Sequence, residues 1–198
     1  MDYCDKNDFT KIKIDFTLRV DKSYLINNII SIDYIKKQLN EYPQIKYIIL
    51  VVKRYLKIKN MNELYEGGIS SFSLYLMVLN TIKMHQKKNY LGKYIKSSEL
   101  LVKFFKRFSR FQFNVVGIGK DNYDYDLYYN FDGVPHILNP LNGDNVAKGR
   151  CKGRDINNTF SNGYQIILSL FSNYDNKDMI SSLFSLSKNE YRNYLRFI

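Results

Sequence analysis

Two adjacent glycines are followed closely by two adjacent serines in residues 67–73, which read GGISSFS. Gly67 and Gly68 are expected to end one helical segment, because glycine adopts positive φ at little cost, and to leave the backbone open to a ligand. The serines follow at the start of a predicted apolar helix, which Ser70 or Ser71 can cap. Amides and hydroxyls at a helix N-terminus favour an anion, so this segment is a candidate phosphate contact. The alternative is purely structural: a helix stop followed by a capped helix.

The composition favours a basic globular protein that binds polyanions. Among 198 residues, 30 Lys and Arg against 19 Asp and Glu give a formal charge of +11, which attracts nucleic acid or nucleotides and makes such binding depend on salt. A genome-wide bias toward Asn, Lys, Ile and Tyr is the alternative explanation of this charge. Cys4 and Cys151 are too few for a disulfide framework or a thiolate metal site, which favours a reducing compartment. The printed sequence has no apolar run of about 18 residues and a polar start, so we expect no membrane partner, no signal peptide and a nuclear or cytoplasmic location.

The pattern along the chain predicts an α+β protein that is predominantly helical. Residues 11–20 alternate apolar and polar side chains and predict a strand. Apolar residues at helical spacing predict helices over 31–40, 43–59, 71–85, 97–108 and 159–172. Apolar runs broken by Gly and Pro between 112 and 138 predict short strands, and a polar loop is expected over 139–158. The sequence DYD at 124–126 is interpreted as an acidic surface turn.

Several motifs together resemble those of a known enzyme family. The segment YEGGISSFSLYLM looks like the signature of the non-canonical poly(A) and poly(U) polymerases, terminal nucleotidyltransferases in which a Gly-Gly-Ile-Ser-Ser-Tyr-Ser segment starts the helix beneath the nucleotide. The preceding ILVVKRYLKIKNMNE is similar to a helix of that family. The segments YLGKYIKSSELLVKFFKRFSRFQF and HILNPLNGDNVAKGR resemble its poly(A) polymerase-associated domain. These motifs occur in the order of the family and cover roughly residues 11–168.

The resemblance implies a site for a nucleoside triphosphate. Lys53 and Lys57, which are four residues apart and therefore on one helix face, match the pair that neutralises the triphosphate. The alternative is that both lysines form the solvated edge of a buried helix. Asn28 matches the asparagine that contacts the ribose hydroxyls, although Ile29 stands where the family usually has glycine.

The residues that follow the glycines match phosphate and base contacts of the family. Ser71, with Ser70 beside it, matches the serine that binds phosphate. Phe72 occupies the place of the tyrosine on which the base stacks. Because stacking requires only a ring, the resemblance implies that phenylalanine can serve.

The loop NPLNGDNVAK corresponds to the motif that touches the base edge. Its candidate nucleotide-binding residues are Asn139, Asn142, Asp144 and Asn145. The loop departs from the family pattern, because Asn139 replaces the usual aspartate, Ala147-Lys148 replace Gly-Arg, and the loop is about one residue shorter. Uridine-selecting members carry a histidine where this chain has Asp144 or Asn145, which favours adenine.

The resemblance also implies a divalent metal, Mg²⁺ or Mn²⁺. Asp15, on its strand, matches the third metal-binding and catalytic carboxylate, and such pairs of ions are held by several carboxylates. The family supplies the other two as an Asp-x-Asp pair after a Gly-Ser turn, and the fourteen residues before Asp15 contain neither feature. The chain is therefore expected to require two further carboxylates and to be inactive alone.

The domain organisation follows from the same resemblance. We expect a remnant of the catalytic palm over 1–28, a central helical domain over 29–89, the poly(A) polymerase-associated domain over 90–155, and C-terminal helices returning to the central domain over 156–198. The implied function is that of the C-terminal part of an enzyme that adds nucleotides, AMP from ATP, to RNA 3′ ends. Two alternatives stay open: a module without the palm that binds nucleotide or RNA, and a helical module that docks a protein such as a zinc-knuckle RNA-binding protein.

Overall fold

The N-terminal part of the chain forms a small sheet and one long helix. The computed structural model describes residues 2–4, 11–13, 22–62, 67–88, 94–127, 133–149, 152–172 and 179–184. Contacts divide the chain into the units Met1–Glu41 and Tyr42–Ile198, each described here by itself. In the first unit, β1 (Asp2–Cys4) pairs antiparallel with β2 (Lys11–Lys13), and α1 (Lys22–Glu41) follows. The strand predicted over 11–20 is thus seen as β2, and its continuation from 14 to 20 lies outside the described residues.

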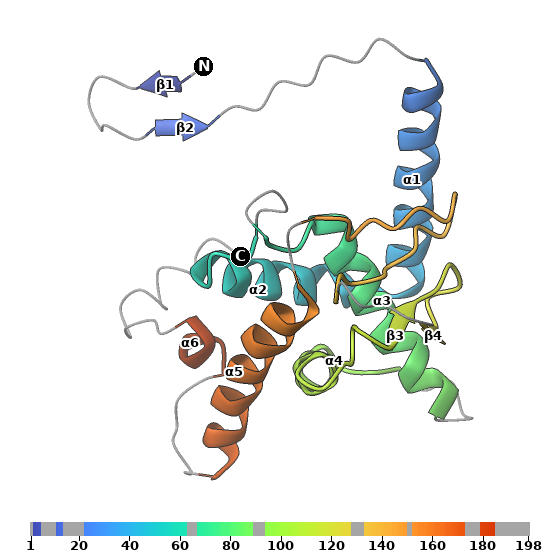
Figure 1. Cartoon of the computed structure of the whole chain (residues 1–198). Helices are drawn as coiled ribbons and strands as arrows, with labels where there is room; N and C mark the ends of the chain where they lie inside the picture. The colour runs from blue at the N-terminus through green and yellow to red at the C-terminus, as the bar shows by residue number, and fades with distance from the viewer. Residues whose placement is uncertain are drawn as a thin grey trace. The chain divides into compact units, whose positions relative to one another are not determined.

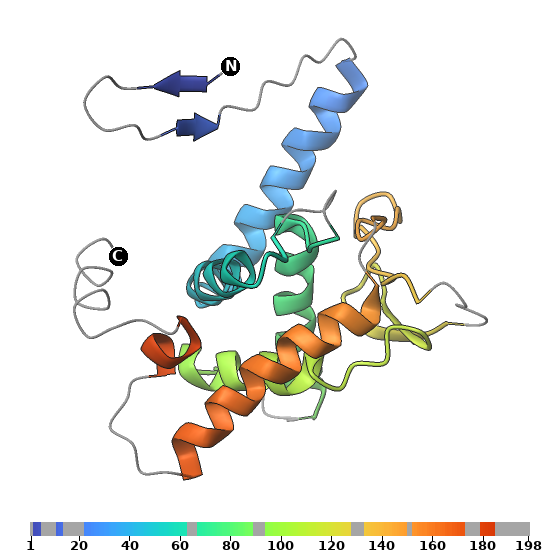
Figure 2. The ribbon, with the colours of Figure 1, turned by 60° about the vertical axis from the view of Figure 1, so that its left-hand side comes forward.

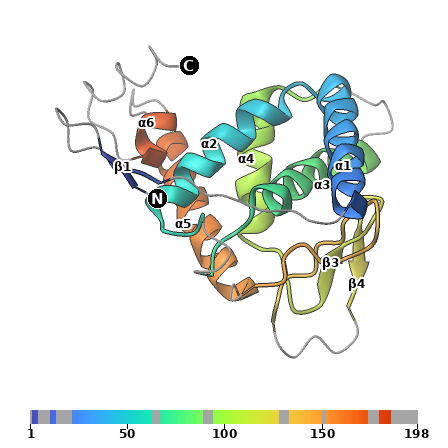
Figure 3. The ribbon, with the colours of Figure 1, turned by 90° about the horizontal axis from the view of Figure 1, so that it is seen from above.

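The second unit is built from helices with one β-hairpin (Figure 1). Its elements are α2 (Ile45–Ile58), α3 (Ser71–Lys88), α4 (Ser97–Phe108), β3 (Val116–Ile118), β4 (Asp124–Asp126), α5 (Gly153–Ser172) and α6 (Met179–Phe184). Helix α3 packs against α2 and α4, and α4 lies alongside α5. Figures 2 and 3 show the hairpin and α6 on opposite sides of these helices. The predominantly helical class predicted from the sequence is confirmed, and the division into four segments stays a prediction.

A cluster of aromatic side chains joins α4 to α5 and α2. Phe104, Phe105 and Phe108 of α4 are fully buried. Their rings meet Phe160 of α5 edge-on or tilted, with centroids 5.2, 5.7 and 6.1 Å apart. Phe105 also meets Tyr55 of α2 edge to face at 5.2 Å. These arrangements place the positive edge of one ring against the negative face of another, which adds to the gain from burial.

Gly163 allows α5 to approach α4 and α2 closely. A Cβ atom at this position would lie 2.3 Å from Cε1 of Phe105 and 3.1 Å from Cζ of Tyr55. The Tyr55 hydroxyl donates a hydrogen bond of 2.7 Å to the carbonyl of Thr159. Burial raises the pKa of Tyr55 to about 12, and a backbone hydrogen bond at Gly163 lowers it in part. The junction of the three helices is therefore tight and contains a phenol that resists ionisation.

Helix α5 begins at Gly153, within the segment that was predicted as a loop over 139–158. The predicted C-terminal boundary of that loop was wrong, because polar residues between 153 and 158 have tertiary partners. Nδ2 of Asn157 donates a hydrogen bond of 2.7 Å to the carbonyl of Phe108. Ile156 is also buried, so the first turn of α5 already packs against the core.

The interpretation of residues 124–126 as an acidic surface turn was wrong. These residues form β4, and Asp124 is only partly exposed, because both its carboxylate oxygens accept hydrogen bonds from Nη2 of Arg107 in α4. Asn80 in α3 accepts a bond of 2.8 Å from Nε of Arg107 and donates one of 2.9 Å to Oδ1 of Asp124. Three elements are thereby joined through one half-buried polar network.

Candidate functional site

The end of α2 is fixed by its own backbone. Asn60 has a φ of 53°, the left-handed conformation with which many helices end. The N–H groups of Asn60 and Met61 donate to the carbonyls of Lys57 and Leu56, at 3.1 and 2.8 Å. Helix α2 thus ends at Ile58, so the glycines that follow do not end it.

The glycine turn is tied to the end of α2. Gly67 has a φ of 92°, which glycine adopts more readily than any other residue. The N–H of Ile69 donates a hydrogen bond of 2.8 Å to the carbonyl of Met61. Gly68 and Ile69 are buried, whereas Gly67 is partly exposed. The expectation that both glycines leave the backbone open to a ligand is therefore wrong for Gly68.

Ser70 caps α3 and leaves Ser71 exposed. The N–H of Ser73 donates to Oγ of Ser70 at 3.0 Å, and the N–H of Leu74 donates to the Ser70 carbonyl at 2.9 Å, as expected of a helix cap. The side chain of Ser71 makes no hydrogen bond with any residue that the structure describes. Ser71 therefore presents a hydroxyl to solvent at this N-terminus.

The start of α3 is bonded to the loop that the sequence assigned to base recognition. Oγ of Ser73 donates a hydrogen bond of 3.0 Å to the carbonyl of Val146, and the hydroxyl of Ser70 bonds to that of Ser73 at 2.8 Å. Beside this contact, a void of only about 10 Å³ is enclosed by Gly68, Ile69, Ser73, Pro135, Ile137, Ala147 and Ile156. That volume is at the lower limit for one water molecule. The turn and the loop are therefore packed as one unit.

The loop itself is a short hairpin. Leu138 and Asn145 form an antiparallel bridge at its base. The N–H of Asn139 donates to the carbonyl of Asp144 at 2.8 Å, and Oδ1 of Asn139 accepts a backbone N–H of the loop at 3.0 Å. At the tip, Nδ2 of Asn142 donates to Oδ2 of Asp144 at 2.7 Å, and both side chains are exposed. The tip thus offers polar groups to solvent.

Asn145 holds the loop in shape. Its Oδ1 accepts the N–H groups of Ile137 and Ala147, at 3.1 and 3.0 Å. Its Nδ2 donates a hydrogen bond of 3.0 Å to the carbonyl of Pro135. These three bonds use most of the hydrogen-bonding capacity of the Asn145 amide, so Asn145 serves the backbone of the loop. The side chains of Asn142 and Asp144 at the tip are bonded to each other but exposed to solvent.

The other candidate nucleotide contacts lie on α2 and α3. Lys53 and Lys57 are exposed on α2, and neither forms a hydrogen bond or ion pair with a described residue. Phe72 is half-buried, and its ring lies parallel to that of Tyr75, with centroids 6.1 Å apart and an interplanar angle of 6°. The ring of Phe72 therefore lies partly exposed beside that of Tyr75 at the start of α3.

Two predicted residues cannot be placed beside these. Asp15 lies outside the described residues, and Asn28 belongs to α1, with a side chain that also lies outside them. Within the described part of the chain, no group of three or more His, Cys, Asp or Glu side chains could hold a metal ion. The donors seen in that part therefore do not fit the implied pair of metal ions. The same residues include no helix long and apolar enough to cross a membrane.

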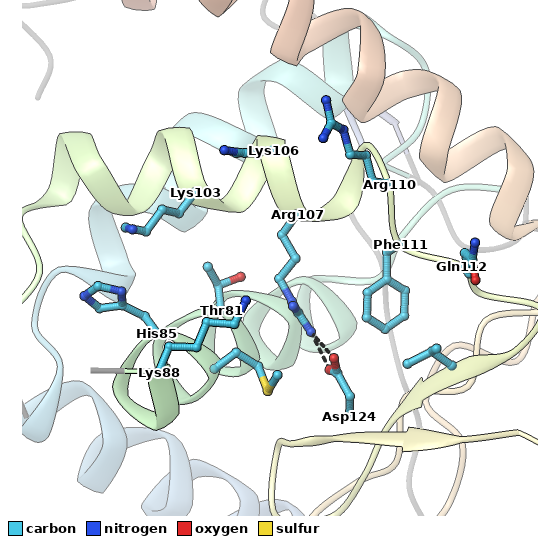
Figure 4. Close-up of a pocket in the computed structure, with 12 residues that line it drawn as sticks. Thr81, His85, Lys88, Lys103, Lys106, Arg107, Arg110, Phe111, Gln112 and Asp124 are labelled. Atoms are coloured by element: carbon cyan, nitrogen blue, oxygen red, sulfur yellow. Dashed lines mark hydrogen bonds and ion pairs between the residues drawn. The ribbon is translucent and has the colours of Figure 1, made fainter. Parts of the chain in front are cut away.

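A cavity of about 490 Å³, which was not predicted from the sequence, lies at the other end of α3 (Figure 4). It lies where α3 and α4 meet the β3–β4 hairpin, and its lining includes Lys88, Lys103, Lys106 and Arg110. The signal available in the sequence was the set of four basic residues in α4 and just beyond it, at i, i+3, i+4 and i+7. That spacing alone does not reveal that α3 adds a fifth basic residue, Lys88.

Comparison with known proteins yields relatives that are poly(A) RNA polymerases, and no family model matches the chain. Poly(A) RNA polymerase CID14 of Cryptococcus neoformans is 28% identical over 170 residues, which cover 79% of this chain and 21% of that protein. Inactive non-canonical poly(A) RNA polymerase protein Trf4-2 of Drosophila melanogaster is 30% identical over 112 residues, or 55% of this chain and 26% of that protein. The chain thus spans about a quarter or less of these two relatives.

Solved structures show the same fold. The polymerase core of TRAMP, an RNA surveillance complex, matches with a TM-score of 0.61 and 19% identity over 76% of this chain and 53% of that one. The structure of mtPAP in complex with UTP matches with a TM-score of 0.55 and 15% identity, over 76% and 41% of the two chains. At these identities the likeness concerns the fold alone.

Proposed function

Because the chain is homologous to part of the non-canonical poly(A) RNA polymerases, we propose that it forms the nucleotide-binding helical part of an RNA nucleotidyltransferase. The whole enzyme would add nucleotides, AMP from ATP, to RNA 3′ ends. The hydrogen bond from Ser73 to Val146 is the observation that carries the proposal. It joins the N-terminus of α3, where phosphate would bind, to the loop that would read the base.

The triphosphate would bind at the start of α3 and beside α2. Ser70 satisfies the N–H of Ser73, whereas the N–H groups of Ser71 and Phe72 have no hydrogen bond with a described residue. These amides lie at the positive end of the helix dipole. Together with the Ser71 hydroxyl they would favour a bound anion. Lys53 and Lys57 add two exposed ammonium groups from α2. A polyphosphate that reached from the start of α3 to this face of α2 would therefore meet both oriented donors and positive charge.

The base would bind between Phe72 and the tip of the loop. The ring of Phe72 lies partly exposed beside that of Tyr75, and base stacking on such a ring tolerates different bases. Asn142 and Asp144 at the loop tip would meet the base edge, and Asn139 and Asn145 would shape the loop. A carboxylate accepts a hydrogen bond from an exocyclic amine, which adenine has and uracil lacks, so ATP is the expected nucleotide.

The chemical step itself is not assigned to the described residues. Transfer of a nucleotide by this family's route relies on Mg²⁺ or Mn²⁺ held by carboxylates, which activates the RNA hydroxyl and stabilises the leaving pyrophosphate. Asp15 would supply one carboxylate, and two more would be required. The role proposed for this chain is therefore to bind and orient the nucleotide.

A second candidate function is nucleotide or RNA binding without catalysis. One specific observation favours it: Trf4-2 of Drosophila melanogaster, which is 30% identical to this chain over 112 residues, is an inactive polymerase protein. Both functions share the nucleotide site described here. They differ only in whether the whole protein transfers a nucleotide.

Replacing both lysines tests the nucleotide site. In calorimetric titrations, Lys53→Ala with Lys57→Ala should weaken ATP binding by roughly tenfold or more, about 1.4 kcal/mol, and leave adenosine binding within about twofold. Lys36→Ala with Lys37→Ala, on exposed positions of α1, removes the same charge and is the matched control. Equal losses for ATP and adenosine, or equal losses in the two double variants, would place Lys53 and Lys57 outside the site.

A further inference from the structure

The basic cavity at the C-terminal end of α3 is separate from the candidate nucleotide site. It encloses about 490 Å³, within the range of ligand sites in proteins. His85 and Lys88 line it from α3, fourteen and seventeen residues beyond Ser71. At 1.5 Å of rise per residue, that separation is about 20 to 25 Å along the helix. One nucleotide bound at Ser71 would not reach the cavity.

The cavity carries more positive charge than its neighbours neutralise. Five of its lining residues are Lys or Arg, and one, Asp124, is acidic. Asp124 is paired with Arg107, and Lys103 lies 3.3 Å from Glu99 in an exposed pair. Exposed pairs of this kind contribute little and leave much of the field in place. The other cations are Lys88, Lys106 and Arg110, which form no ion pair with any described residue.

The helix C-termini at the cavity do not neutralise its positive charge. The last turns of α3 and α4 each carry the equivalent of about half a negative charge. Together they offset roughly one of the three cations that have no acidic partner. Burial chiefly lowers the pKa of His85, which also lines the cavity; Lys103 lowers it further and Glu99 raises it in part. A net attraction for anions is left.

Figure 4 shows how the charges are arranged. Lys103, Lys106 and Arg110 follow one another along α4 and just past its end, and Lys88 lies across the cavity on α3. From Lys103 to Arg110 the rise is about 10 Å, which exceeds the size of a single phosphate group. An extended chain of phosphates matches such a row better than one compact anion.

The aromatic side chain in the cavity is not available to a base. Phe111 is only 7% exposed. The guanidinium of Arg107 covers it, 5.2 Å from the ring centroid. A nucleic acid in this cavity would therefore be held through its backbone and not through stacked bases.

We propose that this cavity binds the phosphate backbone of an RNA strand, without preference for sequence, and that Lys88, Lys106 and Arg110 make the main contacts. The inference rests on the proposed function in that it takes RNA as the polymer on which the whole protein acts. The cavity would provide an RNA contact roughly 20 Å from the nucleotide site. The strand would therefore be held at a second point while its 3′ end is extended.

The test compares two triple variants of the full chain. Lys88→Ala/Lys106→Ala/Arg110→Ala removes the proposed contacts, and Lys36→Ala/Lys37→Ala/Lys46→Ala removes the same charge from exposed positions elsewhere. Fluorescence anisotropy measures the affinity for labelled oligo(A) and oligo(U) of about 15 nucleotides across a range of KCl concentrations. The slope of log K against log salt should fall by about 2 in the cavity variant, since each lost contact to single-stranded nucleic acid removes about 0.7. Oligo(A) and oligo(U) should lose affinity equally.

Other results would overturn the inference. If the cavity variant and the control show the same loss of RNA affinity and the same decrease in the salt slope, RNA binding depends only on the net charge of the protein. If the cavity variant loses binding of inorganic tripolyphosphate but keeps that of RNA, the cavity is a site for a small anion. Calorimetry with ATP separates this test from that of the nucleotide site: the cavity variant should bind ATP as the unmutated chain does, whatever happens to RNA. Circular dichroism confirms that each variant is folded.

Discussion

Arg107 and Asp124 form a two-pronged contact between α4 and β4, in which Nη2 of Arg107 donates to both carboxylate oxygens and the bond to Oδ2 measures 2.5 Å. The two side chains are 19% and 26% exposed, so the pair is largely removed from water. Asn80 from α3 bonds to both partners. Since charge-assisted bonds in such surroundings are stronger than those between neutral groups, the network holds the hairpin on the helices.

Removing the carboxylate should destabilise the fold. Asp124→Ala removes the carboxylate that accepts from Nη2 of Arg107 and from the amide of Asn80. The loss of these bonds to a partly buried charge is expected to lower the free energy of unfolding by roughly 1–3 kcal/mol. Urea unfolding followed by circular dichroism measures the change. Asp126→Ala, on the exposed end of the same strand, should change stability by less than about 0.5 kcal/mol. A loss at Asp124 no larger than that at Asp126 would contradict the role given to the network.

The buried phenol of Tyr55 predicts a loss of stability at high pH. Its pKa is about 12 in the folded chain and about 10 when unfolded. Below pH 10 the phenol is protonated in both the folded and the unfolded state, and its contribution to the free energy of unfolding is fully present. As the pH rises from about 10 to 12 the unfolded state loses the proton first, so roughly 2–3 kcal/mol is lost. Unfolding free energies of the unmutated chain and of Tyr55→Phe, measured across this range, should converge. Parallel curves would show that Tyr55 ionises alike in both states.

Phe72 should contribute to base binding and not to phosphate binding. Phe72→Leu removes the ring, and the expected loss in ATP affinity is roughly 1–3 kcal/mol, with the affinity for inorganic tripolyphosphate unchanged. Calorimetry measures both. Phe171→Leu, at a position 66% exposed on α5, is the matched control and should bind ATP normally. If Phe72→Leu also binds ATP normally, the ring belongs to the packing around Tyr75 alone.

The printed chain by itself should not extend an RNA primer. The sequence resemblance predicts only one metal-binding carboxylate in this chain, Asp15, and one carboxylate should not hold two metal ions. Incubation with a labelled oligo(A) primer, ATP and Mg²⁺ or Mn²⁺, analysed on a sequencing gel, measures extension. Added nucleotides that depend on Asp15 would mean that further carboxylates of this chain complete the site.

Local sequence determined those helices whose apolar residues recur at helical spacing within the segment itself. The predicted helix over 97–108 coincides with α4, and that over 43–59 differs from α2 by at most two residues at either end. The periodicity of 3.6 residues is a local property, and so is the preference of serine for the cap position that Ser70 occupies. The family motifs are also local strings, which is why the homology could be recognised.

Tertiary structure alone decided the contacts between distant residues. Ser73 and Val146 are 73 positions apart, and Arg107 and Asp124 are 17 apart. The first turn of α5 and the partial burial of Asp124 follow from such partners. The basic cavity exists only because α3 and α4 bring their cations together. A sequence pattern shows which face of a helix is apolar, but not which other element will cover that face or which charges will meet beside it, because these depend on how the whole chain packs.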